Sequence, residues 1–213
     1  MKALPNDEYL KRLLISRYLW PSMGLDLGVT AALTKDFAAL SRPIAVTRHE
    51  VLEQPGNYHS GYLYWFEQAL AHTYFIQDMH KKCGLNICDW REPVVDTQAL
   101  LYKEERNGFI EALEDGGALR ISYPSLRALM QVYPVLREVM ERLAEKQEKT
   151  YKALDEYLQC DAAKRYQQFA ILHANILHRL TLEVQAMHVQ VAPQYFLQYN
   201  RRMGFSRISY RTY

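Results

Sequence analysis

The spacing of apolar residues predicts helices at both ends of the chain and strands between them. Apolar residues recur at helical spacing over residues 7–19, and a second short helix is expected over residues 30–40. The segment 42–122 is instead rich in β-branched and aromatic residues and is interrupted by turn sequences. Within it, Gly116 and Gly117 suit a hairpin turn, because glycine accepts positive φ angles. This segment is therefore predicted to form an antiparallel sandwich or barrel of short strands.

The helical period returns in the second half of the chain. A short helix is expected over 124–132 and a long one over 134–158, which begins with a proline, as the first helical turn allows. The long helix carries a heptad seam, whose members are Leu136, Met140, Leu143, Gln147, Thr150, Leu154 and Tyr157. Such a seam is typical of a helix that packs along a partner of similar length, which favours a dimer interface at the first six of these residues. A helix that lies on its own sheet would also show an apolar stripe, so that alternative stays open.

The C-terminal quarter of the chain has the outline of a helix-turn-helix. Asp161 is expected to cap a helix over 161–175. Two further helices, over 180–188 and 193–203, are expected to meet at a turn that contains no glycine. The residues after 203 show strand-like alternation.

Composition limits the classes of protein that are possible. A chain of 213 residues can form one large or two modest domains, and 49% hydrophobic with 23% charged residues is ordinary for a soluble protein. No apolar run approaches the roughly 18 residues that cross a membrane, and the N-terminus has no signal-peptide pattern, so a cytoplasmic location is expected. Cys83, Cys88 and Cys160 lack Cys-x-x-Cys spacing, which favours reduced thiols over disulfides or a zinc site.

Charge is distributed unevenly along the chain. From residue 161 onward, seven basic side chains stand against two acidic ones, so this segment carries a charge of +5 and the first 160 residues carry −3. A basic C-terminal module on an acidic body favours contact with a polyanion through one end of the protein.

Three stretches, taken in order, resemble the Crp/Fnr family of bacterial transcription regulators. HEVLEQPGNYHSGYLYWFEQALAHTYFI is similar to the early barrel strands of the family, and GFIEALEDGGALRISYPSLRALMQVYP to the last strands with the two helices that follow. AKRYQQFAILHANILHRLTLEVQAMHVQVAPQYFLQYNRR resembles the family's winged helix-turn-helix. The resemblance covers nearly the whole chain.

The resemblance implies an α+β fold and a division into three parts. An antiparallel β-barrel of the jelly-roll, cyclic-nucleotide-binding type would span residues 1–133, a dimerisation helix and linker 134–159, and a winged helix-turn-helix 160–213. The implied function is a dimeric DNA-binding transcription regulator, not an enzyme, with no cofactor, no bound metal and no membrane contact. DNA, a second copy of the chain and an unidentified small-molecule effector are the implied partners.

In the helix-turn-helix, Ala186, Pro193 and Phe196 match the small, rigid and apolar positions of the family pattern. Gln190 stands where the family has its turn glycine, Ala192 where it has a capping threonine, and Gln194 and Gln198 where it has glutamate and arginine. Glutamine can still hydrogen-bond adenine with both the oxygen and the NH2 group of its side-chain amide. The residues expected to contact DNA are Gln194, Tyr195, Gln198, Asn200, Arg201 and Arg202.

In the expected effector pocket, Arg106 and Asn107 align with the pair of consecutive residues whose arginine holds the cyclic phosphate in nucleotide-binding members of the family. Val95 and Asp96 align with the family's glycine–glutamate pair. A valine side chain would block the close approach of a ligand to the backbone, and aspartate is one methylene shorter than glutamate. The effector-pocket candidates are Asp96, Arg106, Asn107, Thr150 and Tyr151. The pocket is therefore predicted to have diverged from cyclic-nucleotide binding.

Two other classes of function are alternatives to a DNA-reading regulator. A degenerate family member would keep the fold and the dimer without reading specific DNA, and would act through a ligand or through protein contacts. An enzyme is disfavoured, because His173 and His178 are five residues apart, not on one helical face, and lack the carboxylate of a zinc-protease motif. No nucleophile elbow, phosphate-binding loop or dinucleotide motif occurs. The sequence leaves open the operator, the effector and whether transcription is activated or repressed.

Overall fold

The structure, a computed structural model, describes residues 7–25, 31–77, 81–89 and 92–196. The chain divides into two compact units, the first comprising residues 1–73 and 87–149 and the second residues 74–86 and 150–213. The outer part of one β-hairpin thus groups with the C-terminal helices, and the long helix contributes to both units.

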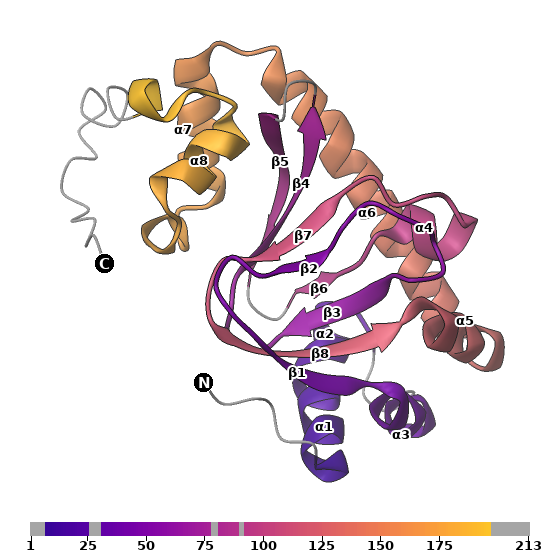
Figure 1. Cartoon of the computed structure of the whole chain (residues 1–213). Helices are drawn as coiled ribbons and strands as arrows, with labels where there is room; N and C mark the ends of the chain where they lie inside the picture. The colour runs from indigo at the N-terminus through magenta and orange to yellow at the C-terminus, as the bar shows by residue number, and fades with distance from the viewer. Residues whose placement is uncertain (1–6, 26–30, 78–80, 90–91, 197–213) are drawn as a thin grey trace. The chain divides into compact units, whose positions relative to one another are not determined.

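Two four-stranded antiparallel sheets form the centre of the fold (Figure 1). The first sheet has the order β1-β8-β3-β6, with bounds Arg42–Val46, Gly116–Ser122, Tyr62–Phe66 and Pro93–Val94. The second has the order β2-β7-β4-β5, with bounds Val51–Glu53, Phe109–Ala112, Ala71–Gln77 and Lys81–Cys88. Among the described residues the strands form these two separate sheets and do not close into one barrel. The antiparallel fold class predicted from the sequence is confirmed.

Helices precede, interrupt and follow the strands of the first unit. Their bounds are α1 Glu8–Leu14, a π-helical turn Ile15–Leu19, α2 Trp20–Ser22, α3 Ala31–Leu40, α4 Thr97–Tyr102, α5 Tyr123–Val132 and α6 Pro134–Leu158. The long helix has the bounds that the sequence predicted. Helix α4, however, lies where only strands were expected, and Asp96 caps its first turn. None of the described helices combines the length and apolarity that crossing a membrane requires.

Strand β3 is buried on both faces, which explains why its sequence, Tyr-Leu-Tyr-Trp-Phe, is apolar throughout. Leu63 and Trp65 point to a core shared with the helices, whereas Tyr64 and Phe66 point to a core between the two sheets. Successive side chains of a strand face opposite sides of its sheet, so this one strand supplies both cores.

Gly61 lets a tyrosine ring lie directly against the backbone before β3. A Cβ atom at this position would come within 2.1 Å of the ring of Tyr123, a distance that no real Cβ contact shows. The backbone N–H of Tyr123 also donates to the carbonyl of Gly61 at 2.9 Å. Glycine is therefore required here for the first turn of α5 to pack against the sheet.

The first half of α6 packs on its own unit, which corrects part of the predicted dimer interface. Leu136 and Met140 have no exposed surface and belong to the helical core, and Leu143 packs against that core. Gln147 donates from Nε2 to the carbonyl of Val95 at 2.7 Å and accepts from Oγ1 of Thr97 at 2.6 Å. Leu136 and Met140 have no surface left for a partner, so for them the alternative of a helix on its own domain holds.

In its described part, the second unit contains a helix that begins at residue 193 and, before it in the sequence, three short helical segments. They are α7 Ala162–Leu172, a 3-10 turn Leu177–Arg179 and α8 Leu182–Val189. Asp161 caps α7 and Thr181 caps α8, each by accepting a backbone N–H from the first turn. The cap at Asp161 confirms the sequence prediction.

The outer part of the β4–β5 hairpin packs against α8 within the second unit. A Cβ atom at Gly84 of β5 would lie 2.4 Å from the imidazole of His188. That imidazole is buried and stacks on the ring of Phe169 in α7, with ring centroids 6.2 Å apart. The glycine therefore allows a close contact between strand and helix that any side chain would prevent.

Candidate functional site

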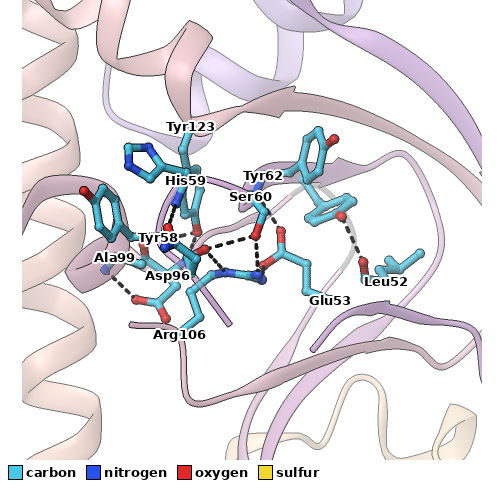
Figure 2. A network of polar contacts seen from close by, with 12 residues as sticks. Leu52, Glu53, Tyr58, His59, Ser60, Tyr62, Asp96, Ala99, Arg106 and Tyr123 are labelled. Atoms are coloured by element: carbon cyan, nitrogen blue, oxygen red, sulfur yellow. Dashed lines mark hydrogen bonds and ion pairs between the residues drawn. The ribbon is translucent and has the colours of Figure 1, made fainter. Parts of the chain in front are cut away.

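A buried arginine marks the candidate site of the first unit (Figure 2). The backbone of Arg106 forms a two-way bridge with Gly56, with N–O distances of 2.9 and 2.8 Å. Its guanidinium donates from Nη1 to Oε2 of Glu53 at 2.5 Å, from Nη2 to Oγ of Ser60 at 3.0 Å and from Nε to the carbonyl of Asn57 at 3.3 Å. The side chains of Arg106 and Glu53 are only 8% and 4% exposed. All three guanidinium nitrogens are thus bonded to groups of the chain itself.

Glu53 is the anion of this pair, and its second oxygen is also used. Oε1 accepts from the backbone N–H of Tyr62 at 2.6 Å. Burial raises the pKa of the Glu53 carboxyl to about 7, although Arg106 and the Tyr62 N–H both favour the charged form and oppose that shift. Desolvation therefore outweighs the ion pair at this site.

Asp96 and Tyr123 lie on the other side of the network, as Figure 2 shows. Oδ1 of Asp96 accepts from the backbone N–H of Ala99 at 3.0 Å and so caps α4. The hydroxyl of Tyr123 accepts from the N–H of Asp96 at 2.9 Å and donates to its carbonyl at 3.2 Å. Burial, followed by the charges of Glu53 and Asp96, raises the pKa of Tyr123 well above its ordinary value.

The structure brings two of the five effector-pocket candidates together. Arg106 and Asp96 belong to one network, but each is bonded to other groups of the chain. Asn107 is exposed beside them. Thr150 and Tyr151 belong to the second unit.

Sequence reasoning missed the other members of the network: Glu53, Asn57, Ser60, Tyr62 and Tyr123. Glu53 is the last residue of a three-residue strand, which is too short for its alternation to predict which side chain points inward. The turn sequence after Glu53 was recognised, but nothing in it indicates that its carbonyl and hydroxyl groups face an arginine.

The described residues contain no group of three or more histidine, cysteine or acidic side chains that could hold a metal ion. His188 is buried against Gly84, and His173 lies beside Phe169 with ring centroids 4.7 Å apart. Cys160, just after the end of α6, donates from Sγ to the carbonyl of Glu156. These contacts are those of packing residues.

The second candidate site is the turn after α8, where Gln190 replaces a glycine. Gln190 adopts the left-handed conformation, with φ 54° and ψ 46°. The N–H of Val191 donates to the carbonyl of Ala186 at 3.0 Å, and that of Gln190 to the carbonyl of Met187 at 3.3 Å. This is the hydrogen-bond pattern of a helix that ends in a glycine-type cap. The geometry expected of a glycine is therefore kept by a glutamine.

Arg165 of α7 ties this turn to the end of the long helix. Its Nε donates to the carbonyl of Val189 at 2.9 Å, and its Nη2 to that of Gln190 at 3.4 Å. Its Nη1 donates to the carbonyls of Leu158 and Cys160 at 3.2 and 2.9 Å. One cation thus satisfies carbonyls at the C-terminal ends of both α6 and α8, where a positive charge is favoured.

Two of the six DNA-contact candidates lie in the described part of the chain. Gln194 and Tyr195 are exposed and lie in the first turn of a helix, where the backbone N–H groups of Tyr195 and Phe196 donate to the carbonyl of Ala192. Phe196 is fully buried and meets the ring of Tyr166 edge-on, with centroids 4.8 Å apart. The remaining candidates, Gln198, Asn200, Arg201 and Arg202, lie outside the described residues.

These sheets and helices define the fold of the Crp/Fnr transcription regulators, and the expected resemblance is confirmed at the level of fold. The c-di-GMP-responsive global regulator CLP of Xanthomonas campestris is similar over 83% of this chain and 92% of its own, with a TM-score of 0.65 and 14% identity. FixK2 of Bradyrhizobium japonicum is similar over 78% of this chain and 85% of its own, with a TM-score of 0.69 and 9% identity.

A CooA mutant of Carboxydothermus hydrogenoformans is similar over 88% of this chain and 85% of its own, with a TM-score of 0.62 and 15% identity. The sequence matches no protein-family model and no curated protein. At these identities the likeness shows the fold, and the role of each residue must be argued from its own contacts.

Replacing Glu53 by glutamine tests the buried ion pair. Because the pKa of Glu53 is raised from 4.5 to about 7, the folded protein keeps a proton that the unfolded chain has lost between these pH values. The free energy of unfolding should therefore fall as the pH rises through this window, by at most about 1.4 kcal/mol per pH unit from this group. In Glu53→Gln this part of the slope should be absent, as urea unfolding at pH 5, 6 and 7 measures. Glu104→Gln, the same change at an exposed position, should keep the slope; an unchanged slope in Glu53→Gln would contradict the assignment.

Replacing Gln190 by glycine should stabilise the second unit. A non-glycine residue in the left-handed conformation costs roughly 1 kcal/mol, which glycine does not incur. We expect Gln190→Gly to raise the free energy of unfolding of this unit by up to about 1 kcal/mol, measured by thermal unfolding. Gln194→Gly, the same substitution at an exposed helical position, should instead lower it by a similar amount. A loss of stability in Gln190→Gly would show that the glutamine side chain makes contacts worth more than the strain.

Proposed function

We propose that this protein is a dimeric DNA-binding transcription regulator of the Crp/Fnr type, whose effector pocket has diverged from cyclic-nucleotide binding. The observation that supports the proposal is the turn after α8, where Gln190 adopts the left-handed conformation without glycine and Arg165 bonds to the carbonyls of Val189 and Gln190. The proposed division is an effector domain over 1–133, a dimerisation helix and linker over 134–159, and a DNA-binding domain over 160–213. The proposed location is the cytoplasm.

Contacts with DNA are assigned to the helix that begins after Ala192. Gln194 and Tyr195 are exposed there, while Phe196 anchors the same turn in the core. Asn200, Arg201 and Arg202 follow in the sequence, and phosphate contacts from such groups supply most of the non-specific affinity of DNA-binding proteins. Gln198 can hydrogen-bond a base but adds no charge, so weak sequence discrimination is expected.

The contacts of the first unit support loss of cyclic-nucleotide binding. A phosphate would have to compete with Glu53, Ser60 and the Asn57 carbonyl for the nitrogens of Arg106. Val95 is 4% exposed and its carbonyl is bonded to Gln147, so its backbone is not open to a ligand. No tight binding of cyclic AMP is expected.

The second candidate function is a family member that keeps the fold without reading DNA. The observation that favours it is the replacement of the charged reading positions by Gln194 and Gln198. Binding of the verified dimer to DNA at low salt separates the two candidates.

DNA binding can be measured by fluorescence anisotropy on duplexes of random sequence at several salt concentrations. Changing Arg201 and Arg202 together to alanine should weaken binding to all sequences alike and reduce the salt slope by about one to two units. Gln198→Ala should cost about 1 kcal/mol or less on random DNA and about 1–3 kcal/mol on an operator. Arg42→Ala with Arg48→Ala, two exposed arginines of the first unit, should leave binding unchanged. No binding by the dimeric wild type at low salt would favour the second candidate.

The proposed dimer uses the part of the seam that the chain's own core leaves available. Of the seam residues, Leu143, Thr150 and Leu154 are half-buried and keep some exposed surface. We expect the wild type to sediment as a dimer at micromolar concentration and Leu154→Lys to sediment as a monomer, because a charge in the seam disfavours helix pairing. Ala153→Lys places the same charge on the neighbouring exposed position and should remain dimeric. A monomeric wild type would contradict this assignment.

A further inference from the structure

The environment of Arg106 is that of an anion-binding site. A guanidinium buried away from water requires a negative partner and hydrogen-bond acceptors, or its burial would be strongly unfavourable. Here the partner is Glu53, the last residue of strand β2, which lies 53 residues before Arg106 in the sequence. Carboxylates and phosphates present similar oxygens to arginine, so either group suits such a position.

The donors around Glu53 are held in place by contacts that do not involve Glu53. The backbone of Arg106 is bridged to Gly56, and its Nε and Nη2 are bonded to Asn57 and Ser60. The second donor to the carboxylate, the N–H of Tyr62, belongs to strand β3, which is paired with β8 from Tyr62 to Phe66. Removing the carboxylate would therefore leave Nη1 of Arg106 and the N–H of Tyr62 directed at a position without an acceptor.

We propose that Glu53 is a built-in ligand of this anion site, so that the chain itself supplies the negative group that an effector would otherwise bring. The proposal rests on the proposed function and deepens it, because it makes the state of the sheet domain independent of an anionic effector. Shortening Glu53 should convert the position into a site for a small external carboxylate or inorganic phosphate.

The test uses the full-length chain and its variant Glu53→Ala, with sodium acetate and sodium phosphate as probes and sodium chloride at equal ionic strength as reference. Thermal unfolding and calorimetry report binding. We expect acetate or phosphate to stabilise Glu53→Ala in a saturable manner, with an affinity at least tenfold above that of the wild type. The double variant Glu53→Ala with Arg106→Gln should lose this response. Glu104→Ala, an exposed carboxylate removed in the same way, should behave as the wild type.

Three outcomes would overturn the proposal. The first is a folded Glu53→Ala that does not respond to either anion. The second is an unfolded Glu53→Ala that acetate does not restore to the circular dichroism spectrum of the wild type. The third is saturable binding of phosphate to the wild type that Arg106→Gln abolishes, since an external anion would then displace Glu53. None of these readouts involves DNA, so failure of the proposed function and failure of this inference are distinguishable.

Discussion

A guanidinium that is buried in protein requires an anionic partner, because an unpaired buried charge is strongly unfavourable. In the first unit, Glu53 is that partner of Arg106. The ion pair joins the end of β2 to the segment before β7. In the loop between Gly56 and Ser60, the carbonyl of Asn57 and the hydroxyl of Ser60 also accept hydrogen bonds from the Arg106 guanidinium. Gly61, directly after that loop, allows the ring of Tyr123 to approach the backbone, and the Tyr123 hydroxyl then holds Asp96. The loop that encloses this charge thus leads directly to the contact with the start of α5, and from there to the cap of α4.

The parts of the fold that the sequence predicted are those with long, regular patterns. Helix α6 has the predicted bounds because 25 residues contain many repeats of the helical period. The surface against which α6 packs could not be predicted, because an apolar stripe has the same pattern whether it packs on a partner helix or on its own domain. In the structure, Leu136 and Met140 are core residues of the chain's own domain. Helix α4 was missed because six residues contain less than two turns, and only its cap, Asp96, is a local signal.

The candidate site was predictable only where a family pattern could be counted along the chain. Arg106 and Asp96 were found that way, and they do share a network. Glu53 and Tyr123 come from distant segments whose proximity is set by strand pairing, so no local spacing indicates them. For the same reason, the role of Arg165 in holding the turn at Gln190 could not be anticipated, because it depends on α7 and α8 packing together.

Gln147 shows why the heptad seam of α6 is interrupted by a polar residue. Its amide bonds to Val95 and Thr97, the residues on either side of Asp96. Asp96 is bonded to Tyr123, and the charge of Glu53 acts on both of these groups. A contiguous set of polar contacts thus runs from the buried ion pair to the long helix. Contiguity alone does not make a switch, which needs an element with two stable arrangements. The polar position in α6 attaches the helix to its own domain.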